Sequence, residues 1–187
     1  MRATYFFLVL SVFLLALLAL VVHYYWRRLR TERHPYGSWE KLLRRLSAVN
    51  RENVALIALS LVDEFGQRRG DENDAIFDEV EIWSMIGGIN GLETLERNCT
   101  VLVDLVFYVQ QWYPEALAVA EQLRLNAREI EWHIGRLKSA AKAGRAEKAF
   151  PEHAEEVVVI YYVMTRRVLA LYEEWSLPGL IELQKAL

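Results

Sequence analysis

The sequence contains little of what a disulfide-stabilised or nucleic-acid-binding protein needs. Its 187 residues include a single cysteine, Cys99, so no intrachain disulfide can form and nothing points to an oxidising compartment. Acidic and basic residues nearly balance at a net charge of −3, which argues against nucleic acid as the main partner. Mixed charge and 12% aromatic residues exclude a disordered chain. No window alternates apolar and polar residues between turn signals, so strands are not expected.

Catalytic and cofactor motifs are equally scarce. The four histidines are scattered along the chain, so neither a Ser/His/Asp nor a Cys/His arrangement can be argued from the sequence. The segment Gly87–Gly91 lacks the Lys-Ser/Thr pair of a phosphate-binding loop, and a plain interhelical turn is expected there. Cys99 lies on an apolar seam and is expected to be a small core residue. We therefore expect no cofactor, no resident metal and no catalytic residue.

One long apolar run stands out against this background. No charged residue occurs from Tyr5 to Tyr25, and only Ser11 and His23 interrupt the hydrophobic side chains. A helix over this range is about 30 Å long, which matches the hydrocarbon core of a bilayer. The rival interpretation is a cleaved signal peptide, whose apolar core would span only about 7–15 residues. The sequence therefore predicts one retained N-terminal transmembrane helix.

The ends of this run predict how the span is anchored and oriented. The aromatic side chains expected at the two membrane–water interfaces are Tyr5, Phe6, Phe7, Tyr24, Tyr25 and Trp26. The arginines expected to contact anionic lipid are Arg27, Arg28, Arg30 and Arg33, although an equally supported alternative is that they only set the topology. Because only Arg2 precedes the span, we expect the N-terminus outside and the remaining chain in the cytoplasm, at an inner or plasma membrane.

The sequence divides into four parts. We expect a membrane anchor with its basic end at 1–33, a linker at 34–38, a helical bundle at 39–176 and a short C-terminal tail or helix at 177–187. Proline and glycine in the linker end the membrane helix, and Ser38 is a suitable N-cap for the helix that follows.

Two helices are expected in the first part of the bundle. One runs from Trp39 to about Arg69, with a break or kink near Asn50–Asn53, and the other covers Asn73–Ile86. The acidic residues of the second lie in its first turns, where they complement the positive end of the helix dipole. Asn90 and Glu93 then have the spacing of a capping box, so the next helix is expected to begin there.

Three long helices with regular apolar seams follow. Apolar residues recur every three or four positions over Leu92–Tyr113, Ala116–Ala141 and Val157–Trp175, with a tight turn at Pro114 and a loop over Gly144–Pro151. This spacing predicts antiparallel helices packed along coiled-coil-like seams. The residues expected in the seams are Leu95, Cys99, Leu102, Val106, Leu123, Ile130, Ile134, Leu137, Val157, Tyr161, Met164 and Val168. The predicted fold is all-α, with a transmembrane helix followed by a cytoplasmic antiparallel bundle.

These features favour a membrane-anchored interaction or scaffold protein without catalytic activity. Its expected partners are the bilayer and either another protein or a second copy of the chain. A first alternative is a membrane-bound enzyme or metal-binding bundle that uses Glu129, His133, His153 and Glu156. The paired Glu-x-x-His motif of di-metal bundles is absent, and these four residues also fit solvated helix-surface pairs. A second alternative is a lipid or apolar-cofactor carrier with an aromatic-lined groove.

Overall fold

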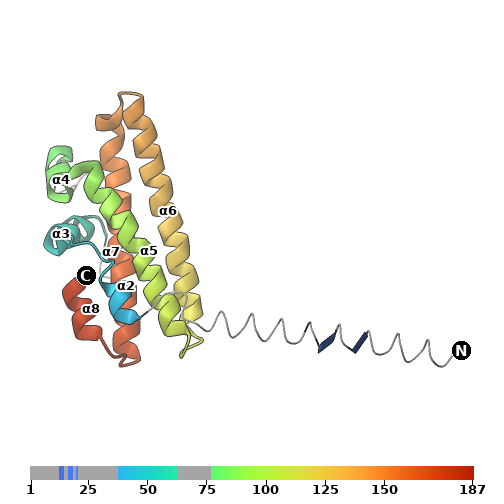
Figure 1. Cartoon of the computed structure of the whole chain (residues 1–187). Coiled ribbons are helices and arrows are strands. Elements are labelled where there is room, and N and C mark those ends of the chain that lie inside the picture. The colour runs from blue at the N-terminus through green and yellow to red at the C-terminus, as the bar shows by residue number, and fades with distance from the viewer. Residues whose placement is uncertain (1–12, 15–16, 19, 21–37, 63–76) are drawn as a thin grey trace, which may run out of the picture. The chain divides into compact units, whose positions relative to one another are not determined.

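The computed structural model describes residues 13–14, 17–18, 20, 38–62 and 77–187 (Figure 1). The chain divides into two compact units, Met1–Ser38 and Trp39–Leu187, and every helix named below belongs to the second unit. Within the described ranges this unit is all-α and contains no strand. Its helices are α2 (Trp39–Leu43), α3 (Arg51–Leu61), α4 (Glu79–Ile86), α5 (Gly88–Gln110), α6 (Ala116–Lys142), α7 (Ala146–Glu174) and α8 (Leu180–Ala186).

The three long helices α5, α6 and α7 form the body of this unit. Helix α6 packs against both α5 and α7, and α5 also packs against α7. The connections 111–115 and 143–145 are short, so successive long helices run antiparallel (Figure 1). The shorter helices pack onto this body, since α3 and α8 contact α7, α2 contacts α5, and α4 contacts α3, α5 and α7.

The apolar seams form the core of the bundle. All the seam residues predicted from the spacing are buried, and none exposes more than 2% of its surface: Leu95, Cys99, Leu102, Val106, Leu123, Ile130, Ile134, Leu137, Val157, Tyr161, Met164 and Val168. Full burial of a Leu, Ile or Val side chain stabilises a fold by about 1.5–3 kcal/mol. Burial also raises the pKa of the Cys99 thiol, so that this residue stays protonated and acts as a small core side chain.

The predicted helix from Trp39 to Arg69 is divided into two. Helix α2 ends at Leu43, residues 44–50 form a turn and a loop, and α3 begins at Arg51. The side chain of Asn50 caps α3 by accepting a hydrogen bond from the backbone N–H of Asn53 at 3.2 Å. The predicted extension beyond residue 62 lies outside the described residues, as does the predicted start of the acidic helix at Asn73.

The loop between α2 and α3 is held by the buried side chain of Asn98 on α5. Its Oδ1 accepts from the Ser47 backbone N–H, and its Nδ2 donates to the Ser47 carbonyl, both at 2.9 Å. The same Nδ2 lies 3.4 Å from the hydroxyl of Tyr161 on α7. Nearby, Arg45 forms a 2.7 Å ion pair with Asp104. These polar contacts fix the loop against two of the long helices.

The glycine-rich turn is shorter than the sequence predicts. Gly87 adopts the left-handed conformation at φ +84°, ends α4, and is followed directly by α5. The predicted capping box at Asn90 and Glu93 is wrong, because Asn90 lies inside α5. Glu93 instead pairs with Lys138 of α6 at 2.8 Å, and this lysine holds the pKa of the Glu93 carboxyl below its usual value.

A capping box is present one helix earlier. The Asp78 carboxylate accepts from the Glu81 backbone N–H at 2.7 Å, and the Glu81 carboxylate accepts from the Asp78 backbone N–H at 3.0 Å. Two of the N–H groups that the start of α4 leaves without helical partners are thereby satisfied. The cap has an Asp in the position where Ser or Thr is usual.

The predicted loop Gly144–Pro151 is mostly helical. Helix α7 already begins at Ala146, so Pro151 lies inside it and one backbone hydrogen bond of its early turns is missing. The neighbouring Phe150 is buried, and its ring centroid lies 4.2 Å from that of Trp83 on α4. Burial of this aromatic side chain offsets the lost hydrogen bond and lets the helix start earlier than proline and glycine suggest.

Substitution of the buried amide tests its role in the fold. We expect Asn98→Ala to lower the free energy of unfolding by about 2–4 kcal/mol, because both backbone groups of Ser47 lose their partner. Urea denaturation of the full chain in mild detergent, followed by circular dichroism, measures the change. Asn126→Ala is the matched control, since the Asn126 side chain accepts a hydrogen bond from Gln122 at an exposed site on α6, and its loss should change stability by no more than about 0.5 kcal/mol. Equal effects of the two substitutions would contradict the role of Asn98.

Candidate functional site

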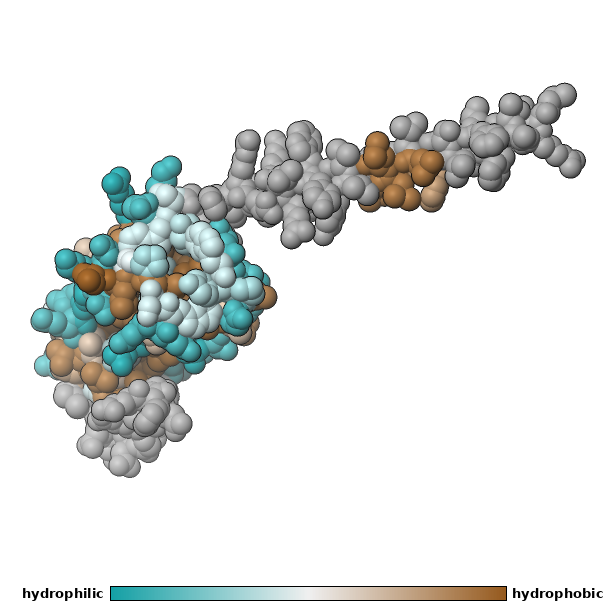
Figure 2. Space-filling view, turned by 90° about the horizontal axis from the view of Figure 1, so that it is seen from below, coloured by the Kyte–Doolittle hydropathy of each residue, from teal (hydrophilic) through white to brown (hydrophobic). Residues whose placement is uncertain are grey.

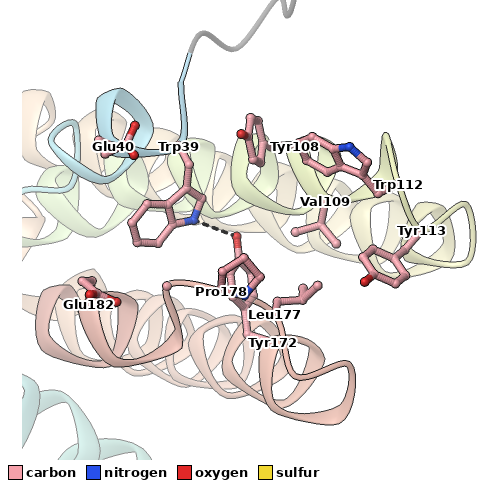
Figure 3. A pocket seen from close by; sticks show the side chains of 11 residues that line it. Trp39, Glu40, Tyr108, Val109, Trp112, Tyr113, Tyr172, Leu177, Pro178 and Glu182 are labelled. Carbon is pink, nitrogen blue, oxygen red and sulfur yellow. Dashed lines mark hydrogen bonds between the residues drawn. The ribbon is translucent and has the colours of Figure 1, made fainter.

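An aromatic pocket of about 740 Å³ lies where α2, α5, α7 and α8 meet (Figure 3). Five aromatic side chains and two carboxylates contribute to its wall. The residues that line it are Trp39, Glu40, Tyr108, Val109, Trp112, Tyr113, Tyr172, Leu177, Pro178, Gly179 and Glu182. The volume falls within the range of about 300–1,000 Å³ that is typical of small-molecule sites.

The back of the pocket is formed by Trp39 and Tyr172. The indole Nε1–H of Trp39 donates a hydrogen bond to the Tyr172 hydroxyl at 3.1 Å, although the two residues are 133 positions apart in the sequence. Gly179 allows this arrangement because a Cβ atom there would lie 2.4 Å from the Trp39 ring. Its φ of +88° is also a conformation that glycine adopts without strain. The Pro178-Gly179 turn is therefore part of the pocket wall.

Tyr172 is a neutral hydroxyl in this site. Its side chain is almost completely buried, and this burial raises the pKa of Tyr172 to about 12, against the opposing effect of the Trp39 hydrogen bond. At physiological pH the phenol therefore carries no charge. It accepts from Trp39 and fixes the indole ring, which gives the pocket one rigid wall.

Three of the aromatic lining residues also pack against other rings. Tyr108 and Trp112 pack edge to face with their centroids 4.9 Å apart, and Tyr113 packs against Trp175 at 4.8 Å. Figure 2 views the end of the domain that carries the 111–115 turn, and shows pale residues of intermediate hydropathy among hydrophilic ones. Tryptophan and tyrosine belong to this intermediate class, with an apolar ring and one polar atom.

The charge of the pocket is of one sign. Glu40 of α2 and Glu182 of α8 are its charged lining residues, and none of the described residues that line it is Lys, Arg or His. Figure 3 draws both carboxylates on one side of Trp39, with Tyr108 and Trp112 on the other. The described lining also contains no Ser, Thr or Cys.

The two histidines of the predicted metal site meet elsewhere, between α6 and α7. The Nδ1 atoms of His133 and His153 lie 3.1 Å apart, and each residue exposes only 9% of its surface. The expectation of solvated helix-surface pairs is therefore wrong for both histidines. The Trp132 ring lies beside the pair, nearly perpendicular to both imidazoles, at centroid distances of 4.8 and 5.9 Å.

A complete metal site is not assembled around this pair. Across residues 38–62 and 77–187, the structure places no three His, Cys, Asp or Glu side chains in a group that could hold a metal ion. Glu129 is exposed and Glu156 is half-buried. Of the four residues in the metal-binding alternative, His133 and His153 are brought into hydrogen-bond contact between α6 and α7.

The predicted membrane anchor falls almost entirely outside the described residues. This holds for the interfacial aromatics and for the arginines: Tyr5, Phe6, Phe7, Tyr24, Tyr25, Trp26, Arg27, Arg28, Arg30 and Arg33. The described side chains of the apolar run are helical and 48–70% exposed: Phe13, Leu14, Leu17, Leu18 and Leu20. Among the helices that can be described, none combines the length and the apolar character needed to span a bilayer.

The aromatic pocket was only partly foreseeable. The sequence permits an aromatic-lined groove, but it does not identify Trp39, Tyr172 and Trp112 as neighbours. A usable signal is that aromatic residues cluster at helix ends, at the start of α2 and in the Trp112-Tyr113 turn.

A comparison with protein-family models, curated proteins and solved structures finds no match for this chain.

A double-mutant cycle tests the histidine pair. We expect His133→Leu and His153→Leu each to lower the free energy of unfolding by about 1–3 kcal/mol, because each removes the buried hydrogen bond between the two rings. The double variant should be less destabilised than the sum of the two, by about 1 kcal/mol or more. Urea denaturation of the full chain in mild detergent measures all four stabilities.

The control for this cycle is an exposed pair on one helix. Gln122 and Asn126 are hydrogen-bonded at 3.2 Å on the surface of α6, and their alanine cycle should be additive within about 0.5 kcal/mol. Additive effects at His133 and His153 as well would show that the two imidazoles do not stabilise one another.

Proposed function

We propose that this chain is a membrane-anchored binding protein without a catalytic site. In this proposal the segment Tyr5–Tyr25 spans the membrane once, and the helical domain 39–187 lies on the cytoplasmic side. The aromatic pocket is the place where the domain receives its partner. The observation that carries the proposal is the pocket itself, with its volume of about 740 Å³ and five aromatic residues in its wall.

The chemistry of the pocket supports binding over catalysis. Trp and Tyr are the residue types that contribute most to binding energy at interfaces, because they combine a large apolar area with a polar atom. The pocket presents both types around one concave surface. Its hydrogen-bonded Trp39–Tyr172 wall is already formed in the free chain, so little ordering entropy is lost on binding.

The anchor part of the proposal has separate support. The run from Tyr5 to Tyr25 has the length and composition of a spanning helix and ends in an aromatic and arginine-rich segment. Phe13, Leu14 and Leu18 each expose more than half of their surface. Exposed apolar side chains of this size are unfavourable in water and favourable in lipid.

Arginine substitutions in the apolar run test the anchor. We expect the full chain to stay with membranes after alkaline carbonate extraction, and Leu14→Arg with Leu17→Arg to release it. Each arginine near the centre of a span disfavours insertion by about 2.5–3.5 kcal/mol. Leu125→Arg is the control, because Leu125 on α6 is 54% exposed, compared with 57% for Leu14, but lies in the helical domain. Retention of the double variant would contradict the anchor, and a C-terminal reporter found outside the cytoplasm would contradict the orientation.

Site-specific photo-crosslinking tests the pocket as the binding site. A photoreactive amino acid replacing Trp112, at the pocket, should give one discrete adduct in the membrane fraction of living cells. The same residue replacing Trp132 should give none, although the two tryptophans are 56% and 57% exposed. The mass of the adduct distinguishes a second copy of the chain, another protein and a small molecule. Equal labelling at both positions would contradict the proposal.

A further inference from the structure

We propose that the aromatic pocket binds an alkylated ammonium cation, with the charged group near Glu182 and its alkyl groups against the aromatic rings. This inference rests on the proposed function, since it names the class of ligand for the same pocket. Three features of the site lead to it: the aromatic wall, the sign of the charge, and the order in which the two are arranged.

The aromatic wall is the first feature. The faces of Trp and Tyr rings carry negative electrostatic potential and attract cations that lie within about 6 Å of the ring centre. Trp39, Tyr113 and Tyr172 come from three different segments of the chain and contribute to one concave surface (Figure 3). A cluster of this kind is the recognised way in which proteins hold quaternary ammonium groups.

The sign of the charge disfavours an anionic ligand. Among the described residues that line the pocket, the charged side chains are Glu40 and Glu182, and Glu182 is exposed. An anion next to Glu182 would meet a like charge. An uncharged apolar ligand would cover Glu182 and remove its water without supplying a hydrogen bond or a charge in return, which is unfavourable. A cation satisfies the carboxylate and the rings at once.

The arrangement of these groups favours an alkylated ammonium over a bare one. The carboxylates lie on one side of Trp39 and further rings lie on the other, so a ligand in contact with both needs a charge and apolar substituents (Figure 3). Alkyl groups on the nitrogen supply apolar surface and spread the charge over it. A primary ammonium is strongly hydrated and would lose more water on entering a pocket walled by Val109, Leu177 and rings.

Comparing the affinities of choline and its uncharged isostere separates the effect of the ligand's positive charge from that of its shape. In 3,3-dimethylbutan-1-ol a carbon replaces the nitrogen of choline, and the size and the hydroxyl are unchanged. The full chain in an uncharged maltoside detergent is titrated with each compound and followed by calorimetry and tryptophan fluorescence. We expect choline to bind at least tenfold more tightly than the isostere, with an affinity that falls as salt increases.

Two exposed lining residues allow variants that keep the fold. We expect Glu182→Gln to weaken choline binding at least threefold and to leave the isostere unchanged. Trp112→Leu should weaken both ligands. The matched controls are Glu129→Gln and Trp132→Leu, which change an exposed carboxylate and an exposed indole elsewhere on α6 and should leave both affinities unaltered.

The outcomes separate this inference from the proposed function. If both compounds bind equally and Trp112→Leu weakens both, the pocket is a binding site for apolar groups and the ammonium inference is overturned. If Trp112→Leu and Glu182→Gln change neither affinity, or if neither compound binds, the inference fails and the photo-crosslinking result alone decides the proposed function.

Choline binding in two lipid compositions distinguishes a lipid headgroup from a soluble compound as the source of the cation. The full chain is placed in nanodiscs of phosphatidylcholine or of phosphatidylglycerol and titrated with free choline. If the cation is a lipid headgroup, free choline binds in phosphatidylglycerol and is competed away in phosphatidylcholine. If it is a soluble compound, choline binds equally in both. Absence of choline binding in phosphatidylglycerol nanodiscs would overturn the inference.

Discussion

The helical domain depends on one buried amide. The side chain of Asn98 satisfies both backbone groups of Ser47 and reaches the hydroxyl of Tyr161, so three distant segments meet at one polar point. Since a buried backbone group without a partner is costly, the loop 44–50 has one strongly favoured position against α5 and α7. Helix α2 leads directly into this loop. The Asn98 amide thus contributes to placing Trp39 against Tyr172. The position of this part of the pocket wall therefore depends on the Asn98–Ser47 contact, which lies outside the pocket.

The long helices were predictable because an apolar seam is a local property of the sequence. A residue such as Leu102 or Ile130 is buried whichever partner helix covers it, so spacing alone identifies the core. Helix boundaries were less predictable. Gly87 alone ends α4 through its left-handed backbone conformation, so the break between α4 and α5 is short. Phe150 packs on Trp83, and α7 begins before Pro151. The first effect is a local backbone conformation and the second is a tertiary contact, and the spacing of apolar residues reports neither.

The polar contacts could not be predicted from the sequence, because they also depend on which helices meet. His133 and His153 have charged residues three or four positions away, which is typical of an exposed face, yet their rings turn toward one another between α6 and α7. The pocket depends still more on tertiary structure, since Trp39 and Tyr172 are 133 positions apart. Sequence spacing places a side chain on a face of its own helix. It does not say which other helix that face meets.

The proposed anchor would raise the effective affinity of the aromatic pocket for ligands in the membrane. Residues 26–38 lie between the predicted span and α2, and a chain of this length reaches at most about 45 Å from the bilayer. A domain tethered so close meets membrane-bound ligands at an effective concentration that a free domain would not reach. Cation contacts with a few rings and one carboxylate are individually modest. If the chain is anchored as proposed, the translational entropy of bringing the domain to the membrane is lost once, in anchoring, and such contacts need to supply less of the binding free energy.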